Sequence, residues 1–498
     1  MLDVAIIGAG LGGLAAAIRL RQDGVQQVRV LERSHEVGGT WRDNVYPGCA
    51  CDVPSHLYSY GFEPHSDWTR PYPQQAEIQN YILQVTEKYQ LRPLIQLGAE
   101  VTVLRWLADV ACWQVELRGG ELIQARHVVM ATGPLNKPLI PDLPGLSEFA
   151  GHSFHSCEWR HDLDLTGKRV AVIGTGASAV QFVPEIAKQA ASVEVFQRTA
   201  AWVLPRWDQP YGAVRCWAYR HIPGLQRLSR WRIYWFNEMV GMGFMGWKPM
   251  QKLLRKMALH HLRRQVPDPA LRVSLTPNFN PGCKRLLLSN SWFPTLQQTH
   301  VHLHTEAVAG ITPNGVVGAS GQERQCDVII WGTGFKAAEL VTPLQVYGEA
   351  PAGSQTPPEL GALWRSQAPA TRLGITVAGF PNFYMLVGPN TGLGHNSIIF
   401  MVECQVRYIV QALRYLRQRG ARQLHLRPAV AQADYARMQQ AMQGTVWASG
   451  CHSWYQNPQG QIDTLWPGYT WQYWLQSRWF NPADYRLEDL DPASGSKD

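Results

Sequence analysis

The sequence lacks several features that would assign it to particular protein classes. None of its nine Cys belongs to a CxxC pair, so we expect no dithiol redox centre. Their odd number also argues against a disulfide framework, and Cys49 and Cys51 are interpreted as inert thiols. No basic leader with a small-residue cleavage site precedes the first apolar run, which predicts a cytoplasmic location.

Charged residues make up only 17% of the chain, and much of the net charge of +8 falls in segment 253–265. At helical spacing its side chains divide into an apolar face (Leu253, Leu254, Met257, Ala258, Leu262) and a basic remainder (Arg255, Lys256, Arg263, Arg264). A solvated helix face is one interpretation. Weak contact of segment 231–265 with a membrane surface is the other, because residues 231–247 are rich in aromatics and Met.

The same segment argues against a membrane-spanning protein and against a nucleic-acid-binding protein. Asn237 and Glu238 interrupt the aromatic stretch, which is too short to span a bilayer. No finger, RNP or helix-turn-helix pattern accompanies the basic residues, so we expect no nucleic-acid partner. The length of 498 residues, with 20 Trp and 44 Gly, instead suggests an enzyme of about three domains with aromatic pockets and close-fitting Gly loops.

A Gly-rich unit occurs twice, as LDVAIIGAGLGG at 2–13 and as KRVAVIGTGASA at 168–179. Each copy follows a β-branched run, opens a helical stretch and leads to a second strand, the order of a dinucleotide-binding unit. In each copy the first Gly makes the turn, the second admits a pyrophosphate and the third residue permits close helix packing. These residues are Gly8, Gly10 and Gly13, and Gly174, Gly176 and Ala179. Two bound dinucleotides are predicted, and two structural turns without ligand are the alternative.

The second strand of each unit distinguishes the two ligands. The first strand ends in Glu32, whose carboxylate can accept hydroxyl groups of an adenosine ribose, as in FAD or NAD. The second has Gln197 at that place, followed by Arg198 and Thr199, so that a guanidinium can bind a 2′-phosphate. We therefore predict FAD in the first unit and NADPH in the second, with a ligand-free surface Arg as the alternative for Arg198.

The order of these motifs predicts an α/β fold of two interleaved Rossmann-like dinucleotide-binding domains with a helical insertion. Strands HVVMATGPL at 127–135 and DVIIWGTGF at 327–335 end in Gly-rich turns that are expected to carry the chain between the domains. The expected ranges are 1–140 plus 385–498 for the FAD domain, 150–204 plus 301–384 for the NADPH domain, and 205–300 for the insertion.

Near the C-terminus, a strand and a Gly/Asn turn lead to a helix that is expected to begin near Asn396 or Ser397. Its N-terminal dipole could face the flavin and stabilise negative charge there. A plain connection without ligand is the alternative, and His395 in the turn is interpreted as structural.

Two motifs resemble those of the type I Baeyer–Villiger monooxygenases, a group of class B flavoprotein monooxygenases. The stretch GGTWRDNVYPGCACD meets the family pattern (A/G)GxWxxxx(F/Y)P(G/M)xxxD at Gly38, Gly39, Trp41, Tyr46, Pro47, Gly48 and Asp52. The stretch FAGHSFHSCEWR is similar to the family fingerprint FxGxxxHxxxW through Phe149, Gly151, His155 and Trp159. Arg160 departs from that fingerprint and resembles the ending found in the sister flavin-containing monooxygenases.

The resemblance implies that NADPH reduces FAD and that a flavin C4a-peroxide then inserts oxygen next to a ketone carbonyl, giving an ester or lactone. It implies Arg285 as the cation that stabilises the anions of this reaction, oriented by Asp52. Lys284 would join Arg198 and Thr199 on the 2′-phosphate. A surface basic pair is the alternative for Lys284 and Arg285, and a turn-capping carboxylate is the alternative for Asp52.

Further site residues are implied by the same resemblance. Contacts to FAD would come from Gly39, Thr40, Trp41, Tyr58 and the backbone of Val101 on an edge strand. His155 and Trp159 would shape NADP movement, or would hold the domains together. No metal is expected, and pocket residues are expected from 205–300 and from the Trp447–Tyr455 loop.

The sequence is compatible with three functions. The first is a Baeyer–Villiger monooxygenase that uses O2 and a small-molecule ketone, which we expect to be lipophilic and acyclic. An N- or S-oxygenating flavin-containing monooxygenase is favoured by Arg160 and disfavoured by Asp52 and Arg285. A non-catalytic flavoprotein is favoured only by the basic aromatic segment.

Overall fold

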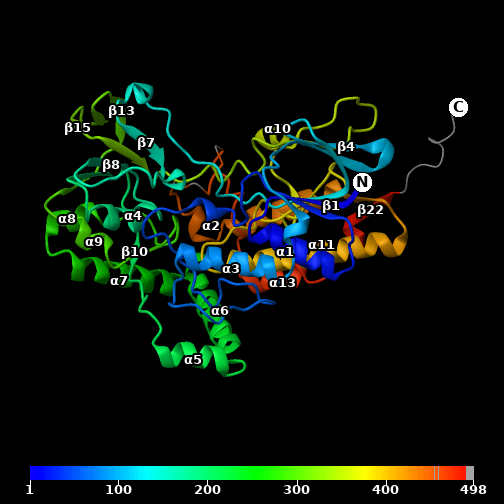
Figure 1. Cartoon of the computed structure of the whole chain (residues 1–498), viewed down its shortest axis with the longest axis horizontal. Helices are drawn as coiled ribbons and strands as arrows, with labels where there is room; N and C mark the ends of the chain where they lie inside the picture. Colours follow the sequence, from blue (N-terminus) through cyan, green and yellow to red (C-terminus); the bar gives the residue numbers. More distant parts are fainter. Residues whose placement is uncertain (452, 454, 458, 489–498) are drawn as a thin grey trace.

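The computed structural model describes residues 1–451, 453, 455–457 and 459–488, and two mainly parallel sheets dominate it (Figure 1). Parts of two sequence-based expectations therefore lie outside the described residues. They are positions 452 and 454 of the Trp447–Tyr455 loop, and positions 452, 454, 458 and 489–498 of the range 385–498.

The first sheet is built around β1 (Leu2–Ile7), which pairs in parallel with β2 (Val28–Leu31) and β6 (Leu122–Met130). The last four residues of β1 are buried, as expected of a central parallel strand covered on both faces. The remaining strands are β3 (Ile95–Gln96), β4 (Val101–Leu107), β5 (Cys112–Leu117), β17 (Gln345–Tyr347), β18 (Thr371–Arg372), β19 (Thr376–Val377) and β20 (Phe383–Met385). Since β4 lies between β17 and β5, the expectation of an edge strand at Val101 is wrong.

Long helices cover this sheet. Helix α1 (Leu11–Gln22) follows β1 and contacts α11 (Ile398–Arg419), which in turn contacts α13 (Thr470–Ser477). The start of α11 at Ile398, with Ser397 before it, lies where the sequence predicted. The other elements here are α2 (Thr40–Asp43), α3 (Gln75–Lys88), α10 (Leu360–Ser366), α12 (Pro428–Met442), β21 (Gln423–Leu426) and β22 (Tyr485–Glu488).

The second sheet repeats the arrangement on a smaller scale, with strand order β12-β9-β8-β16-β7. Its central strand β8 (Arg169–Ile173) leads through the second Gly-rich turn into α4 (Ala179–Ile186) and then β9 (Ser192–Phe196). The remaining strands are β7 (His152–His155), β12 (Val301–His304) and β16 (Val328–Trp331), with a separate three-stranded sheet of β13 (Val308–Thr312), β14 (Gly315–Gly318) and β15 (Glu323–Gln325). Two Rossmann-like units are therefore present.

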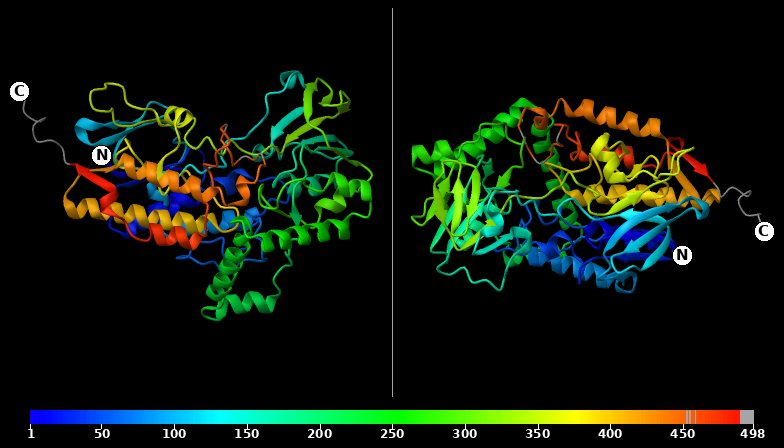
Figure 2. Two further views of the ribbon diagram at one scale, coloured as in Figure 1. Left: turned by 180° about the vertical axis from the view of Figure 1, so that it is seen from behind. Right: turned by 90° about the horizontal axis from the view of Figure 1, so that it is seen from above.

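Residues 205–300 are mainly helical, as predicted. They contain α5 (Ala213–His221), α6 (Leu225–Phe244), α7 (Lys248–Gln265), α8 (Pro269–Ser274), α9 (Trp292–Thr295) and β11 (Leu287–Leu288), which pairs with β10 (Val203–Leu204). Figure 2 shows this region at one end of the molecule, largely below and beside the second sheet in its left view. On α7, Leu254, Ala258 and Leu262 are buried as expected, whereas Leu253 is exposed because it lies outside that face.

The chain crosses between the two sheets at the expected Gly-rich turns. One crossing leaves β6 after Met130, the other leaves β16 after Trp331, and the two meet at a bridge between Pro138 and Phe335. Strands β17 to β20 all belong to the first sheet, so the prediction that 301–384 lies entirely in the NADPH unit is wrong. We propose that the FAD unit resumes near Gln345. No helix of the described residues is both long enough and apolar enough to cross a membrane.

Candidate active site

A cavity of about 970 Å³ lies at the carboxyl ends of β1 and β8, and it is lined by both Gly-rich turns and both crossing connections. This volume is near the top of the range of about 300–1,000 Å³ for ligand sites. The sequence-predicted residues that line it are Gly8, Gly10, Glu32, Gly39, Thr40, Trp41, Asp52, Tyr58, Val101, Gly174, Gly176, Arg198, Thr199, Lys284 and Arg285. Gly13, Ala179, Phe149, Gly151, His155 and Trp159 do not line it.

The first Gly-rich turn brings α1 against the end of β1. Gly8 has φ +103°, a conformation that favours Gly, and a Cβ on it would lie 2.8 Å from the carbonyl oxygen of Ala131. A Cβ on Gly13 would lie 1.9 Å from the carbonyl oxygen of Gly8. At Gly10 the nearest atom is 3.8 Å away, so this position leaves room at the cavity wall. The third position is thus required for packing, as the sequence predicted, and the second leaves space at the cavity wall.

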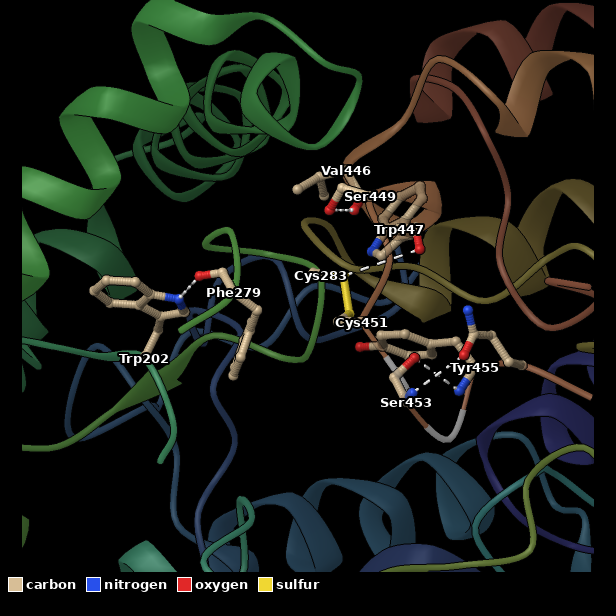
Figure 3. The surroundings of a disulfide bond; sticks show 10 residues. Trp202, Phe279, Cys283, Val446, Trp447, Ser449, Cys451, Ser453 and Tyr455 are labelled. Atoms are coloured by element: carbon tan, nitrogen blue, oxygen red, sulfur yellow. Dashed lines mark hydrogen bonds between the residues drawn. A yellow bond between two sulfur atoms is a disulfide. The ribbon is translucent and has the colours of Figure 1, made fainter. Parts of the chain in front are cut away.

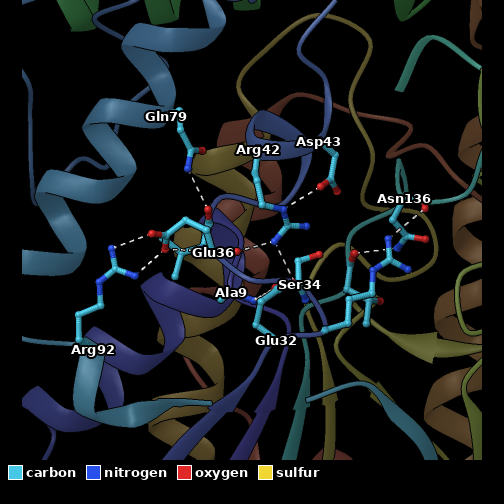
Figure 4. Close-up of polar contacts among 12 residues, drawn as sticks. Ala9, Glu32, Ser34, Glu36, Arg42, Asp43, Gln79, Arg92 and Asn136 are labelled. Carbon is cyan, nitrogen blue, oxygen red and sulfur yellow. Dashed lines mark hydrogen bonds and ion pairs between the residues drawn. The ribbon is translucent and has the colours of Figure 1, made fainter. Parts of the chain in front are cut away.

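Glu32 at the end of β2 is buried and holds this turn in place (Figure 4). One carboxylate oxygen accepts a hydrogen bond from the backbone N–H of Ala9 at 2.8 Å, and the other accepts from the N–H of Ser34 at 3.0 Å. Arg42 forms an ion pair with Glu32 at 2.9 Å. Sequence reasoning missed Arg42, although it stands between two motif positions. Because Glu32 also lines the cavity, it can both shape the turn and face a ribose.

Helix α2 forms the part of the cavity wall next to the first Gly-rich turn. Gly39 has φ +55° at its start, and a Cβ there would lie 3.2 Å from the Cα of Gly10, so the two turns lie against each other. The indole N–H of Trp41 donates to the hydroxyl of Tyr58 at 2.9 Å, and both rings are buried. Thr40 and Val101 complete this part of the lining.

The second Gly-rich turn faces a pair of cations. Gly174 has φ +104°, and a Cβ there would lie 2.5 Å from the carbonyl oxygen of Gly332. Burial and the nearby charge of Arg198 lower the pKa of Lys284. Within the described part of the chain no carboxylate forms an ion pair with either cation. Two cations near each other at a Gly-rich turn fit the phosphate of a nucleotide.

Arg285 and Asp52 meet across 233 residues of sequence. The guanidinium donates from Nε to Oδ2 at 2.8 Å and from Nη2 to Oδ1 at 2.7 Å, a bidentate pair. The carboxylate of Asp52 raises the pKa of Arg285 above its ordinary value, although burial opposes this. Both residues line the cavity, so the site holds a permanent, oriented cation.

The turn before α11 forms another wall. Leu393 and Asn396 line the cavity, whereas the side chain of His395 is fully buried 3.6 Å from Glu238 of α6. Burial raises the pKa of Glu238, but the nearby His395 and hydrogen bonds from Thr470 and Asn396 outweigh it and hold that pKa below its ordinary value. His395 therefore anchors the turn to the helical insertion and does not face the cavity.

The residues of the 149–160 motif lie behind the cavity wall. His155 at the end of β7 is buried, its ring is in contact with Phe335 of a crossing connection, and burial lowers its pKa to about 4. The Trp159 ring contacts the rings of Phe154 and Phe182. Arg160 is exposed and pairs with Asp162 at 2.6 Å, so the departure from the fingerprint is not at the cavity.

Cys283 and Cys451 form a disulfide with Cα atoms 6.2 Å apart (Figure 3), a single bond that the sequence did not indicate. A separation of 168 residues gives no local signal for such a pair. The bond joins the segment that carries Lys284 and Arg285 to the C-terminal loop, and Cys283, Trp447 and Tyr455 are buried in one apolar cluster. Cys49 and Cys51 are unbonded and buried, and burial raises the pKa of Cys49 to about 11, in keeping with inert thiols.

The expected pocket residues are only partly in place. From 205–300 the cavity is lined by Phe279, Lys284, Arg285 and Leu287, and near the C-terminus by Thr464 and Leu465. Neither the aromatic stretch 231–247 nor the described residues of the Trp447–Tyr455 loop line it. Trp231 and Trp235 are exposed instead, so they give no information about the shape or polarity of the substrate pocket.

Comparisons with known proteins bear on these observations. The family described as pyridine nucleotide-disulphide oxidoreductase matches residues 5–234. A Baeyer-Villiger monooxygenase of Pseudomonas aeruginosa is 41% identical over 486 residues, which cover 97% of this chain and 91% of that protein. A Baeyer-Villiger monooxygenase of Streptomyces coelicolor is 41% identical over 492 residues, covering 98% and 93%.

Solved structures are similar over the same length. An oxidized steroid monooxygenase bound to NADP has a TM-score of 0.85 and 28% identity, covering 98% of this chain and 99% of that one. The complex of OTEMO with FAD and NADP has a TM-score of 0.85 and 27% identity, with the same coverage.

Proposed function

The chain belongs to the Baeyer–Villiger monooxygenases, which are FAD- and NADPH-dependent flavoproteins, and we propose that Arg285, held by Asp52, is the cation with which it inserts oxygen next to a ketone carbonyl. The observation that carries this proposal is the bidentate Arg285–Asp52 pair at the wall of a cavity shared by both Gly-rich turns. The reaction consumes O2 and NADPH, and bound FAD supplies the activation of oxygen.

Arg285 acts through charge and position. Its raised pKa keeps the guanidinium protonated throughout the physiological range. A fixed cation stabilises the negative charge that develops on reacting oxygens, because in a water-poor site it needs no reorganisation. Asp52 fixes the plane of the guanidinium with two hydrogen bonds and limits the cost of burying its charge. Asp52 is therefore a positioning residue.

The remaining residues divide between two cofactor sites. We assign FAD to the first Gly-rich turn, with the contacts expected from Gly8, Gly10, Glu32, Gly39, Thr40, Trp41, Tyr58 and Val101. NADPH belongs at the second turn, with Gly174, Gly176, Arg198, Thr199 and Lys284. Gly13 and Ala179 support the two turns from behind. Supporting this assignment, the carboxylate of Glu32 is hydrogen-bonded to the first turn at Ala9. Gly174 of the second turn donates a backbone hydrogen bond to Phe196, two residues before Arg198, whose charge acts on Lys284.

Arg198→Ala is expected to raise the KM for NADPH by about 10- to 150-fold and to leave the KM for NADH little changed. Each charge-assisted phosphate contact contributes about 1.5–3 kcal/mol, and NADH has no 2′-phosphate. Steady-state NADPH and NADH oxidation measures both constants. Arg33→Ala changes the Arg that follows Glu32 in the first unit and is the matched control. It should alter neither the KM for NADPH nor the KM for NADH. An equal rise in KM for both cofactors would show that Arg198 does not bind the 2′-phosphate.

The reaction type is tested by product analysis. We expect the FAD-loaded enzyme with NADPH and O2 to convert ketones to esters or lactones, detected by mass spectrometry, in preference to oxidising a thioether or an amine. N- or S-oxygenation was favoured by Arg160, whose side chain is exposed and paired with Asp162. A thioether or amine oxidised with no ketone turned over would favour that alternative. A preference for lipophilic, acyclic ketones and a cytoplasmic location stay predictions.

A further inference from the structure

Helix α6 exposes its apolar side to solvent. Leu228, Trp231, Trp235 and Met239 recur at helical spacing and are between 43% and 60% exposed, and Phe236 beside them is 52% exposed. A helical stripe at this spacing normally faces a protein core. In two opposite views, α5 and the adjoining part of α6 project away from both sheets (Figure 1; Figure 2, left).

Two charged side chains of the same helix are instead fixed inside the protein. Arg230 donates hydrogen bonds to the carbonyl oxygens of His56, Leu57 and Ser59. Glu238 is buried and accepts hydrogen bonds from Asn396 and Thr470. Rotating the helix to bury its apolar stripe would separate these two charged groups from their partners, and an uncompensated buried charge is strongly destabilising. The outward direction of the stripe is therefore determined by the fold.

Exposed apolar residues also lie on the elements that precede α6 in the chain, one of which, α5, contacts it. Together with those of α6, these residues, which we call the outer aromatic face, are Trp207, Val214, Trp217, Ile222, Leu228, Trp231, Trp235, Phe236 and Met239. Four of the nine are Trp. A group of large exposed apolar residues on neighbouring elements is typical of an interaction site.

The charge of the same segment is strongly one-sided. Residues 209–267 contain eleven Lys or Arg and a single acidic residue, the buried Glu238. Their net charge of +10 exceeds the +8 of the whole chain, so the other 439 residues together carry −2. Ten of the eleven basic side chains are exposed: Arg215, Arg220, Arg227, Arg232, Lys248, Lys252, Arg255, Lys256, Arg263 and Arg264.

We propose that the outer aromatic face docks on the surface of an anionic phospholipid bilayer. Trp side chains favour the boundary between headgroups and acyl chains, and flanking Arg side chains pair with anionic headgroups. A second copy of this chain is a poorer occupant, because it would bring another +10 against the first. The surface also gives the aromatic stretch 231–247 a role that the substrate cavity does not.

The proposal is tested by cosedimentation of the FAD-loaded full chain with vesicles. We expect binding to vesicles that contain phosphatidylglycerol, weaker binding at high salt, and little binding to phosphatidylcholine alone. The triple variant Trp217→Ser, Trp231→Ser, Trp235→Ser should bind at least about tenfold more weakly, because its apolar contacts with the bilayer are lost. Trp479→Ser, an exposed Trp that follows the end of α13, is the matched control.

A second variant tests the contribution of the basic side chains. Arg227→Gln with Arg232→Gln should weaken binding to the anionic vesicles by about thirtyfold, since each basic residue near such a surface contributes about fivefold. Arg365→Gln with Arg486→Gln, also exposed, is the matched control.

Three outcomes would overturn the proposal. The first is no binding of the unmodified protein to anionic vesicles at low salt. The second is equal binding by the triple Trp variant. The third is a lipid-free dimer that the same Trp changes convert to a monomer, which would make the face an interface between copies. Vesicle binding needs no turnover, so its failure leaves the proposed reaction intact, and loss of ester formation leaves this proposal intact.

Discussion

Replacing Arg285 with Ala is expected to abolish ester formation while leaving FAD bound. The FAD-side residues lie on other segments, around Gly8, Glu32 and Trp41, so their contribution to affinity is retained. Removing one preorganised donor to a developing anion costs about 10²- to 10³-fold in rate, and here a full positive charge is removed as well. Ester formed per NADPH consumed, in the flavin-loaded variant, measures the effect.

Two companion variants sharpen this test. Arg285→Lys should recover little activity, because an ammonium cannot reproduce the bidentate geometry with Asp52. Asp52→Asn should bind FAD but lose much of the ester yield, since the guanidinium is then neither charge-paired nor held in plane. NADPH oxidation that continues with release of hydrogen peroxide is expected in the Ala variant. An ester yield near the unmodified value would show that Arg285 is not the catalytic cation.

Gly13→Ala is expected to strip FAD from the enzyme. Helix propensity alone favours Ala over Gly by about 1 kcal/mol, but the added Cβ would lie 1.9 Å from the carbonyl oxygen of Gly8. That atom belongs to the backbone of the turn itself, so α1 must move away from β1 and the turn must open. Overpacking a core with an extra side-chain group costs about 1–3 kcal/mol. A contact of 1.9 Å with a backbone atom is more severe, so the clash outweighs the gain in helix propensity.

Gly12→Ala is the matched control for this change. It stands one residue earlier in the same helix, and its Cβ would meet the end of the Leu386 side chain at an ordinary 3.4 Å. Flavin absorbance of the purified protein and thermal unfolding with added FAD distinguish the two variants. If Gly13→Ala retained FAD as well as Gly12→Ala does, the tight packing of α1 on the turn would not be required for FAD binding.

Local motifs made part of the site predictable. The spacing of Gly8, Gly10 and Gly13 specifies a strand, a turn and a helix, because only that geometry needs Gly at those places. The pairing of Asp52 with Arg285 was also anticipated, although only the family resemblance connected two residues so far apart. By contrast, the exposed position of Arg160 has no local signal, since its neighbour Asp162 is equally compatible with a buried pair.

Features that depend on contacts between distant segments could not be predicted from the sequence. Strands β17 to β20 are two or three residues long, too short to show a period of two, so the sequence placed the return to the FAD unit about 40 residues late. Periodicity indicates that α6 has an apolar stripe but not which way it faces. The direction is decided by Arg230 and Glu238, whose buried partners come from distant segments.

The interleaved order of the strands has a consequence for synthesis on the ribosome. Strand β20 pairs with β6, yet its residues emerge about 250 positions later, which at about 5–20 residues per second is roughly 12–50 s. Until then the edge of β6 and the surface of α1 that α11 will cover have no native partner. No strand of the first sheet lies between β7 and β16 in the chain, so the second unit can complete its five-stranded sheet first. The nascent FAD unit is thus the part of this protein with most need of a chaperone.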